Sequence, residues 1–130
     1  MIKALVSKII TGESQPIVKE YVTEINTYKD YYKHLEVSLF DAVRVQWKGK
    51  DISVYVDDEG MLKEGNYGRM VMGYPEPLFG NLVIVGGVDS KGDTLPIPEE
   101  IKLLDLREFI SDIKYVTGVN NEARRDSSLL

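Results

Sequence analysis

Few side chains in this sequence have the chemistry that catalysis needs. His34 is the only histidine and there is no cysteine, which excludes thiolate nucleophiles, disulfides and cysteine-based zinc sites. His34 falls at the end of an expected helix, where a surface role is favoured over that of a general base. Asp57, Asp58 and Glu59 form the densest carboxylate cluster. A calcium loop spreads its ligands over about 12 residues, so a solvated turn is favoured over a metal site.

Residues 64–80 are the best candidate for a binding surface. Glycine and proline interrupt this stretch too often for one regular element, at Gly65, Gly68, Gly73, Pro75, Pro77 and Gly80. Irregular segments that carry aromatic side chains are common binding sites. The run GNYGR at residues 65–69 lacks the Gly-Lys-Ser/Thr ending of a phosphate-binding loop, so it is a weak nucleotide signature.

Arg69 is the residue of this stretch whose chemistry best suits a charged ligand. An arginine offers a planar fork of donors that matches phosphate and stacks on flat rings. Tyr67, Tyr74 and Phe79 surround it in the sequence and could stack on a base. A salt bridge to a neighbouring carboxylate would explain Arg69 equally well, and both interpretations stay open.

Two further arginines are candidates for contact with an anion. Arg44 belongs to an expected strand, from which it could point into a ligand cleft, although a solvated sheet face is favoured. Arg107 falls in the first turn of the last expected helix, where the helix dipole disfavours a cation. That placement hints at an anionic partner.

The rest of the chain contains the elements that position these residues. Alternating apolar residues and turn signals predict four strands, at residues 2–10, 17–22, 41–47 and 52–56. The continuous apolar run at residues 82–85 predicts a central strand. A first helix is expected at residues 28–35, capped by Asn26 or Thr27.

The C-terminal part is expected to be helical. Pro98 suits the first turn of a helix, followed by two glutamates that the helix dipole favours. Asp105 and Glu108 have the spacing of a capping box at the start of a helix whose apolar face runs to Ile113. Gly118 is a plausible end for that helix.

These elements predict an α+β protein: an antiparallel sheet with one early helix and one or two C-terminal helices that cover one sheet face. The 130 residues with 43% hydrophobic content fit a single folded domain. We expect that domain at residues 1–119 and a polar tail at 120–130.

Charge and hydropathy limit the classes of partner. The net charge is -5, and no basic stripe for long nucleic acids is visible. No run approaches the roughly 20 apolar residues that span a bilayer, and the N-terminus lacks the features of a signal peptide. We therefore expect a cytoplasmic protein without membrane or long nucleic-acid partners. The absence of a recognisable metal-binding or catalytic pattern further predicts that it uses no metal or other cofactor.

Residues 35–95 resemble a group of small phage and prophage proteins. The shared pattern is a strand, an acidic Glu-Gly turn with a loop carrying Asn and Arg (VDDEGMLKEGNYGRMVM), and a Gly-Asn-apolar-Gly-Gly strand with a Gly-Asp turn (LFGNLVIVGGVDSKGDTL). Within that group the chain is similar to phage anti-Thoeris proteins of the first type. Those proteins are sponges that sequester the cyclic ADP-ribose isomer made by bacterial TIR enzymes and do not degrade it.

The resemblance implies a homo-oligomer, a dimer or higher, in the cytoplasm of a bacterial host. It also implies a cyclic nucleotide ligand, with cyclic oligonucleotides in separate sites of some members. Together with the reading of the residues, it gives these candidate ligand-binding residues: Arg69, Phe79, Asn81, Tyr67, Tyr74, Asn66 and Arg107.

Three functions are therefore considered. The leading hypothesis is a non-enzymatic protein that sequesters a cyclic nucleotide signal. The alternative is an acidic inhibitor or DNA mimic that acts on a host defence enzyme, which the net charge of -5 suggests. A hydrolase or transferase that uses His34 or Asp57 is the least favoured.

Overall fold

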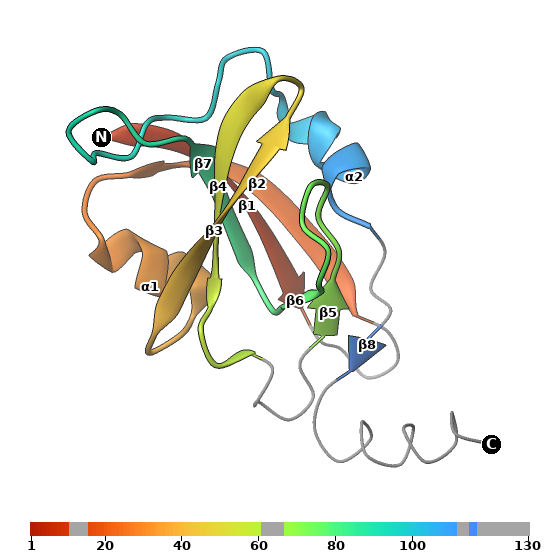
Figure 1. The fold of residues 1–130 in the computed structure, drawn as a ribbon. Coiled ribbons are helices and arrows are strands. Elements are labelled where there is room, and N and C mark those ends of the chain that lie inside the picture. The colour runs from red at the N-terminus through yellow and green to blue at the C-terminus, as the bar shows by residue number, and fades with distance from the viewer. Residues whose placement is uncertain (11–15, 61–66, 112–114, 117–130) are drawn as a thin grey trace.

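The computed structural model describes residues 1–10, 16–60, 67–111 and 115–116 (Figure 1). Its strands are β1 (Ile2–Ile10), β2 (Ile17–Ile25), β3 (Phe40–Trp47), β4 (Lys50–Asp57), β5 (Tyr67–Arg69), β6 (Leu78–Phe79), β7 (Leu82–Gly86) and β8 (Tyr115–Val116). Its helices are α1 (Lys29–Leu35), the 3-10 turn η2 (Leu103–Asp105) and α2 (Leu106–Phe109). The α+β class is confirmed.

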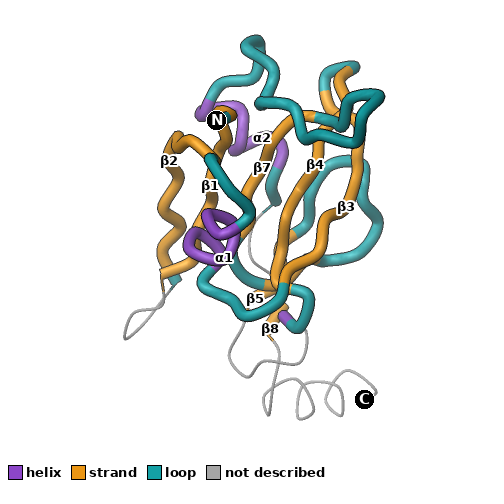
Figure 2. Tube along the Cα trace, turned by 90° about the vertical axis from the view of Figure 1, so that its left-hand side faces the viewer, coloured by secondary structure: helices purple, strands orange, loops and turns teal. Residues whose placement is uncertain are grey.

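One large sheet organises the described part of the chain. Five strands pair antiparallel in the order β2-β1-β7-β4-β3, and Figure 2 shows them in this order with α1 in front. The apolar run at β7 is central, as the sequence predicts. β2 extends three residues beyond the predicted end, to Ile25. A small second sheet has the order β6-β5-β8.

Both faces of the large sheet are covered, whereas the sequence predicted helices on one. Figure 1 shows α1 and α2 on opposite sides of the sheet. The core on the α1 side contains Ala4, Val6, Ile25, Tyr31, Leu35, Val83 and Val85. The larger core on the other side takes side chains from β1, β3, β4 and β7, from Val71 and Leu78 before β7, and from the chain between Ile97 and Ile110 after it. The sheet is therefore the middle layer of the molecule.

One short C-terminal helix is present, as expected, but the prediction that Pro98 begins a further helix is wrong. Pro98 begins only a turn, in which the Ile101 N–H donates to the Pro98 carbonyl at 3.0 Å. The helix α2 spans only Leu106–Phe109, and Ile110 is extended and bridges Val71. Ile97, Ile101, Leu106, Phe109 and Ile110 are all buried in the larger core. Their spacing does not follow one helical face, so the chain must bend to bury each of them.

The capping prediction for α2 is also wrong. The Asp105 side chain does not cap that helix. Its Oδ2 instead accepts the Lys102 N–H at 2.8 Å, one turn earlier, at the start of η2. Ile113, Gly118 and the expected tail at 120–130 lie outside the described residues. No helix in the described ranges is long and apolar enough to cross a membrane.

Replacing Phe109 with alanine should lower the free energy of unfolding by about 3–5 kcal/mol. Phe109 is fully buried and stacks on Trp47, with ring centroids 4.2 Å apart. Leu104→Ala is the control, because Leu104 is 70% exposed and its loss should cost less than about 0.5 kcal/mol. Urea unfolding followed by circular dichroism measures both, and equal losses would contradict the assigned core.

Candidate functional site

Arg69 lies inside the fold rather than on its surface. Its side chain is 1% exposed. The guanidinium donates two hydrogen bonds to Ser7: Nη1 donates to the carbonyl oxygen at 3.0 Å, and Nη2 donates to the hydroxyl oxygen. Burial lowers the pKa of Arg69 to about 10, and Glu20 opposes that shift. No carboxylate of the described residues lies within ion-pair distance of Arg69. The residue therefore joins β5 to β1.

Phe79 and Asn81 also make contacts within the fold. Phe79 is buried at the end of β6. The Asn81 Oδ1 accepts the Ile9 N–H at 2.8 Å, and its Nδ2 donates to the Leu35 carbonyl at 3.2 Å. Asn81 thereby ties β1 to the end of α1, and both ends of its amide are occupied.

The remaining candidates that the structure describes lie on three separate segments. Tyr67 on β5 and Tyr74 are half-buried, and Tyr74 packs against the larger core. Arg107 is exposed on α2. Asn66 lies outside the described residues.

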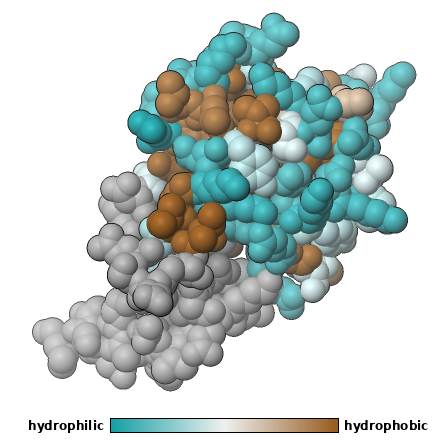
Figure 3. Space-filling view, turned by 180° about the vertical axis from the view of Figure 1, so that it is seen from behind, coloured by the Kyte–Doolittle hydropathy of each residue, from teal (hydrophilic) through white to brown (hydrophobic). Residues whose placement is uncertain are grey.

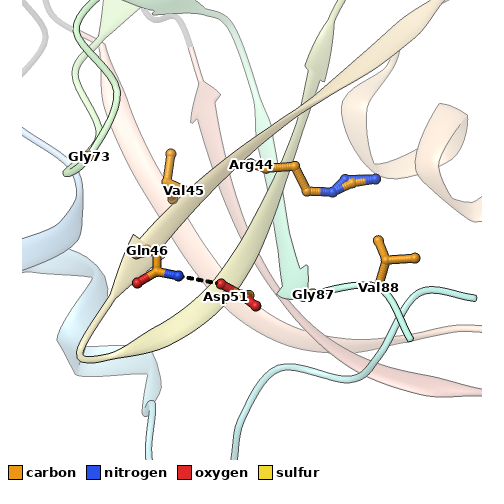
Figure 4. A pocket seen from close by; sticks show the side chains of 7 residues that line it. All are labelled: Arg44, Val45, Gln46, Asp51, Gly73, Gly87 and Val88. Atoms are coloured by element: carbon orange, nitrogen blue, oxygen red, sulfur yellow. Dashed lines mark hydrogen bonds between the residues drawn. The ribbon is translucent and has the colours of Figure 1, made fainter. Parts of the chain in front are cut away.

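A hollow at the β3 edge of the large sheet is a better candidate site. It has a volume of about 640 Å³, which is within the usual range of ligand pockets. Its lining comes from β3, the start of β4, the chain after β7 and one glycine of the 70–77 segment (Figure 4). The lining residues are Arg44, Val45, Gln46, Asp51, Gly73, Gly87 and Val88.

The pairing of β3 with β4 brings the polar groups of this hollow together. Gln46 lies directly opposite Asp51, and Arg44 opposite Ser53, so these side chains share the sheet face that α1 covers. The Gln46 Nε2 donates to the Asp51 Oδ1 at 2.6 Å. In Figure 4 the Arg44 side chain extends away from this pair toward the side of Val88. The hollow thus offers a cationic fork and a separate amide–carboxylate pair.

Two glycines set the walls of the hollow. A Cβ at Gly87 would come within 2.9 Å of the Asp51 Cβ. Gly73 has a φ of +86°, and a Cβ there would lie 3.2 Å from the Val45 Cβ. Glycine lets both segments approach the strands closely. A larger residue at either place would displace a wall of the hollow.

The charge of Arg44 is available to a ligand. The side chain is exposed, and no carboxylate in the described ranges lies within ion-pair distance of it. Two lysines follow in the same hairpin, where Lys48 pairs with Asp105 at 3.7 Å and Lys50 with Glu100 at 3.0 Å. Arg44 is therefore a local positive charge on an acidic chain.

The residues considered for catalysis lie elsewhere. The His34 Nδ1 is 2.7 Å from the Tyr21 hydroxyl, and its Nε2 is 3.4 Å from the Thr23 hydroxyl. Both partners belong to β2, at the opposite end of the sheet from β3. Asp57 is buried and its Oδ1 accepts the Glu59 N–H at 2.9 Å. Within the described ranges no three potential ligands cluster as a metal site would require.

Sequence reasoning named Arg44 but favoured a solvated face, and it missed Gln46, Asp51 and the two glycines. The available signals were the alternation of β3, which places Arg44 and Gln46 on one face, and the Gly86-Gly87 pair after a buried strand. What the sequence does not contain is the strand order that leaves β3 at an edge.

Replacing Arg69 with alanine should lower the free energy of unfolding by about 3 kcal/mol, because it leaves a cavity and removes the partners of two buried Ser7 groups. Arg107→Ala, at an exposed arginine, should change it by less than about 0.5 kcal/mol. Chemical denaturation compares the two. A fully stable Arg69→Ala protein would show that the Ser7 contacts do not stabilise the fold.

Stability should fall as the pH drops below the ordinary pKa of histidine. Burial, with Lys8 and Lys33, lowers the pKa of His34, so the folded state takes up its proton less readily than the unfolded state. Unfolding free energy should therefore decrease between pH 7.5 and 5.5 by more in the wild type than in His34→Gln. Parallel pH profiles for the two proteins would refute this.

The chain was compared with protein families, curated proteins and solved structures. Residues 8–110 match a family model described as a domain of unknown function (DUF3846). No curated protein and no solved structure matches significantly. The match covers the large sheet from the end of β1 and both helices. The chain belongs to the DUF3846 family.

Proposed function

We propose that this protein captures a small phosphate-bearing ligand of the nucleotide class in the Arg44 hollow and releases it chemically unchanged. The first ligand to consider is a cyclic ADP-ribose isomer, in keeping with the resemblance to phage anti-Thoeris sponges. On this proposal the protein acts against a defence signal in the cytoplasm of a bacterial host. The observation that carries the proposal is that Arg44, which forms no ion pair with any described residue, lies beside a hollow of about 640 Å³.

Arg44 supplies the contact for phosphate. A guanidinium binds phosphate oxygens with two parallel hydrogen bonds, which are stronger than bonds between neutral groups. Because Arg44 has no carboxylate partner among the described residues, binding would not first have to break an ion pair. This favours a charged ligand over a neutral one.

The opposite part of the hollow suits hydroxyl groups. The Asp51 carboxylate has accepting positions beyond the one that Gln46 uses, and the Gln46 amide keeps a carbonyl oxygen and a second N–H. Ribose hydroxyls both donate and accept, so they complement this pair. Val88, which is exposed, gives an apolar surface for a base.

The proposed ligand contacts lie at the β3 edge of the sheet rather than in the 64–80 segment. Arg69 and Asn81 hydrogen-bond within the fold, and Phe79 is buried. Arg69 and Phe79 are buried, so a ligand could reach them only if the fold opened, and the Asn81 amide would have to give up its present hydrogen bonds. Arg44, Gln46 and Asp51 are exposed already.

A binding role without turnover is supported by the position of the only histidine. His34 contacts β2, whereas the hollow is built on β3 and β4. A general base must lie within hydrogen-bond reach of the proton that it removes. His34 does not meet that condition for a ligand in the hollow.

Calorimetry with cyclic ADP-ribose isomers tests the proposal. Arg44→Gln should weaken binding about 10- to 100-fold, the effect of losing a charged hydrogen bond worth about 1.5–3 kcal/mol. Arg107→Gln is the matched control, because it makes the same change at an exposed arginine on α2. Heating the complex should return the ligand with its mass unchanged.

Three results would contradict the proposal. They are the absence of binding heat with every isomer, an equal loss in the two glutamine variants, and a cleaved product after heating. The alternative, an acidic inhibitor of a host enzyme, predicts the first of these. Thermal unfolding of each variant shows whether a loss of binding reflects a loss of the fold.

A further inference from the structure

The outer edge of β2 is a long and regular strand edge without a partner among the described residues. β2 is the last strand in the sheet order and pairs with β1 through nine consecutive residues, from Ile2 opposite Ile25 to Ile10 opposite Ile17. No bulge interrupts this pairing, and the strand contains no proline. Natural proteins commonly use bulges, prolines, short strands or charged side chains to prevent edge pairing. This edge has none of the first three, and its charged residues are Lys19, Glu20 and Glu24.

Apolar side chains accompany this free edge. Ile17, Val18 and Val22 on β2 are 63%, 41% and 47% exposed. The turn η2 contacts β2, and its Leu104 is 70% exposed. Figure 3, which views the molecule from behind relative to Figure 1, shows apolar side chains gathered in patches among hydrophilic ones. Exposed apolar area next to unpaired backbone groups is typical of a protein interface.

We propose that β2 pairs antiparallel with β2 of a second copy of this chain, about a twofold axis that passes midway between the two copies of Tyr21. Each strand then supplies backbone donors and acceptors to the other, and the two five-stranded sheets become one continuous sheet. This inference goes beyond the proposed function and does not depend on it.

The sequence of β2 suits pairing with itself in one register. With Tyr21 opposite Tyr21, all nine residues find a partner. The other pairs are Ile17 with Ile25, Val18 with Glu24, Lys19 with Thr23 and Glu20 with Val22. No like charges stand opposite each other, and the aliphatic part of each glutamate covers a valine of the other copy.

Neighbouring registers are less favourable. Only alternate residues of an edge strand point their backbone N–H and C=O groups outward. The partner strand can therefore shift only by an even number of residues, which keeps these outward groups opposite one another. A shift of the partner strand by two residues in one direction places Glu20 opposite Glu20 of the second copy. A shift by two residues in the other direction places Glu20 opposite Glu24. Like charges directly opposite destabilise a strand pair, so the sequence selects the Tyr21 register.

Cysteine cross-linking tests this register directly, because the chain has no cysteine of its own. Directly opposite residues have Cα atoms about 4.5–5.5 Å apart, within the range of about 4.4–6.8 Å that a disulfide requires. Tyr21→Cys should therefore form a covalent dimer on oxidation. Thr23→Cys is the matched control, because two copies of residue 23 would lie about 13 Å apart along the strands.

A pair of charge variants tests the same contact without cross-linking. Val22→Glu places a carboxylate opposite Glu20 of the second copy at two symmetric positions, whereas Val22→Lys places an ammonium group there. The dimer dissociation constant of Val22→Glu should exceed that of Val22→Lys by about tenfold or more. Leu39→Glu, at an exposed residue outside β2, should leave the constant unchanged. Sedimentation equilibrium measures all of these constants.

The expected set is a wild-type dimer, cross-linking at position 21 only, and the charge order described. A monomeric wild type, equal cross-linking at positions 21 and 23, or equal constants for the two Val22 variants would overturn the proposal. Circular dichroism confirms that each variant is folded. If Tyr21→Cys fails to fold, because Tyr21 contacts His34, the two Val22 variants still decide the question.

Discussion

The burial of β7 on both faces is the constraint on which the rest of the fold depends. Leu82 and Ile84 point into the larger core, and Val83 and Val85 point into the core under α1. All four are fully buried. A strand without a polar face can exist only where both sides of the sheet are covered. Because α1 is short and covers one side, the chain after β4 must cover the other.

That requirement explains the segment that the sequence marked as a binding surface. Val71, Leu78 and the half-buried Tyr74 of this segment supply part of the missing layer, so they pack inward. Arg69 comes with this layer and reaches β1, where Ser7 accepts two of its hydrogen bonds. A pKa of about 10 leaves the guanidinium charged at neutral pH. Burying a charge is costly unless it is hydrogen-bonded, and these two bonds offset part of that cost.

Much of the fold follows from local patterns, and the site does not. Alternation predicted β1, β3 and β4, and an apolar run predicted the central strand β7. A C-terminal helix is present but shorter than predicted, because Ile97, Ile101 and Phe109 all lie in the core and their spacing does not follow one helical face. Residue types pointed to Arg69 as a ligand contact. Whether an arginine is accessible depends on the packing of distant segments, which no local pattern contains.

The two open edges of the sheet have different chemistry. The β3 edge carries Arg44 and the Gln46–Asp51 pair beside a hollow, which suits a small polar ligand. The β2 edge is regular over nine residues and exposes Ile17, Val18 and Val22, which suits another strand. These two strands stand at opposite ends of the sheet order, with β1, β7 and β4 between them.

The separation of the edges has a consequence for an assembled protein. A twofold axis perpendicular to the sheet keeps the α1 face of both copies on the same side, so Arg44 and Gln46 of each copy would lie on one common face. Pairing through β2 would leave each hollow complete, because no residue of β2 lines it. Ligand capture and strand pairing, as proposed, would therefore be separate properties of one sheet, and a change at one edge would reach the other only by altering the strands between them.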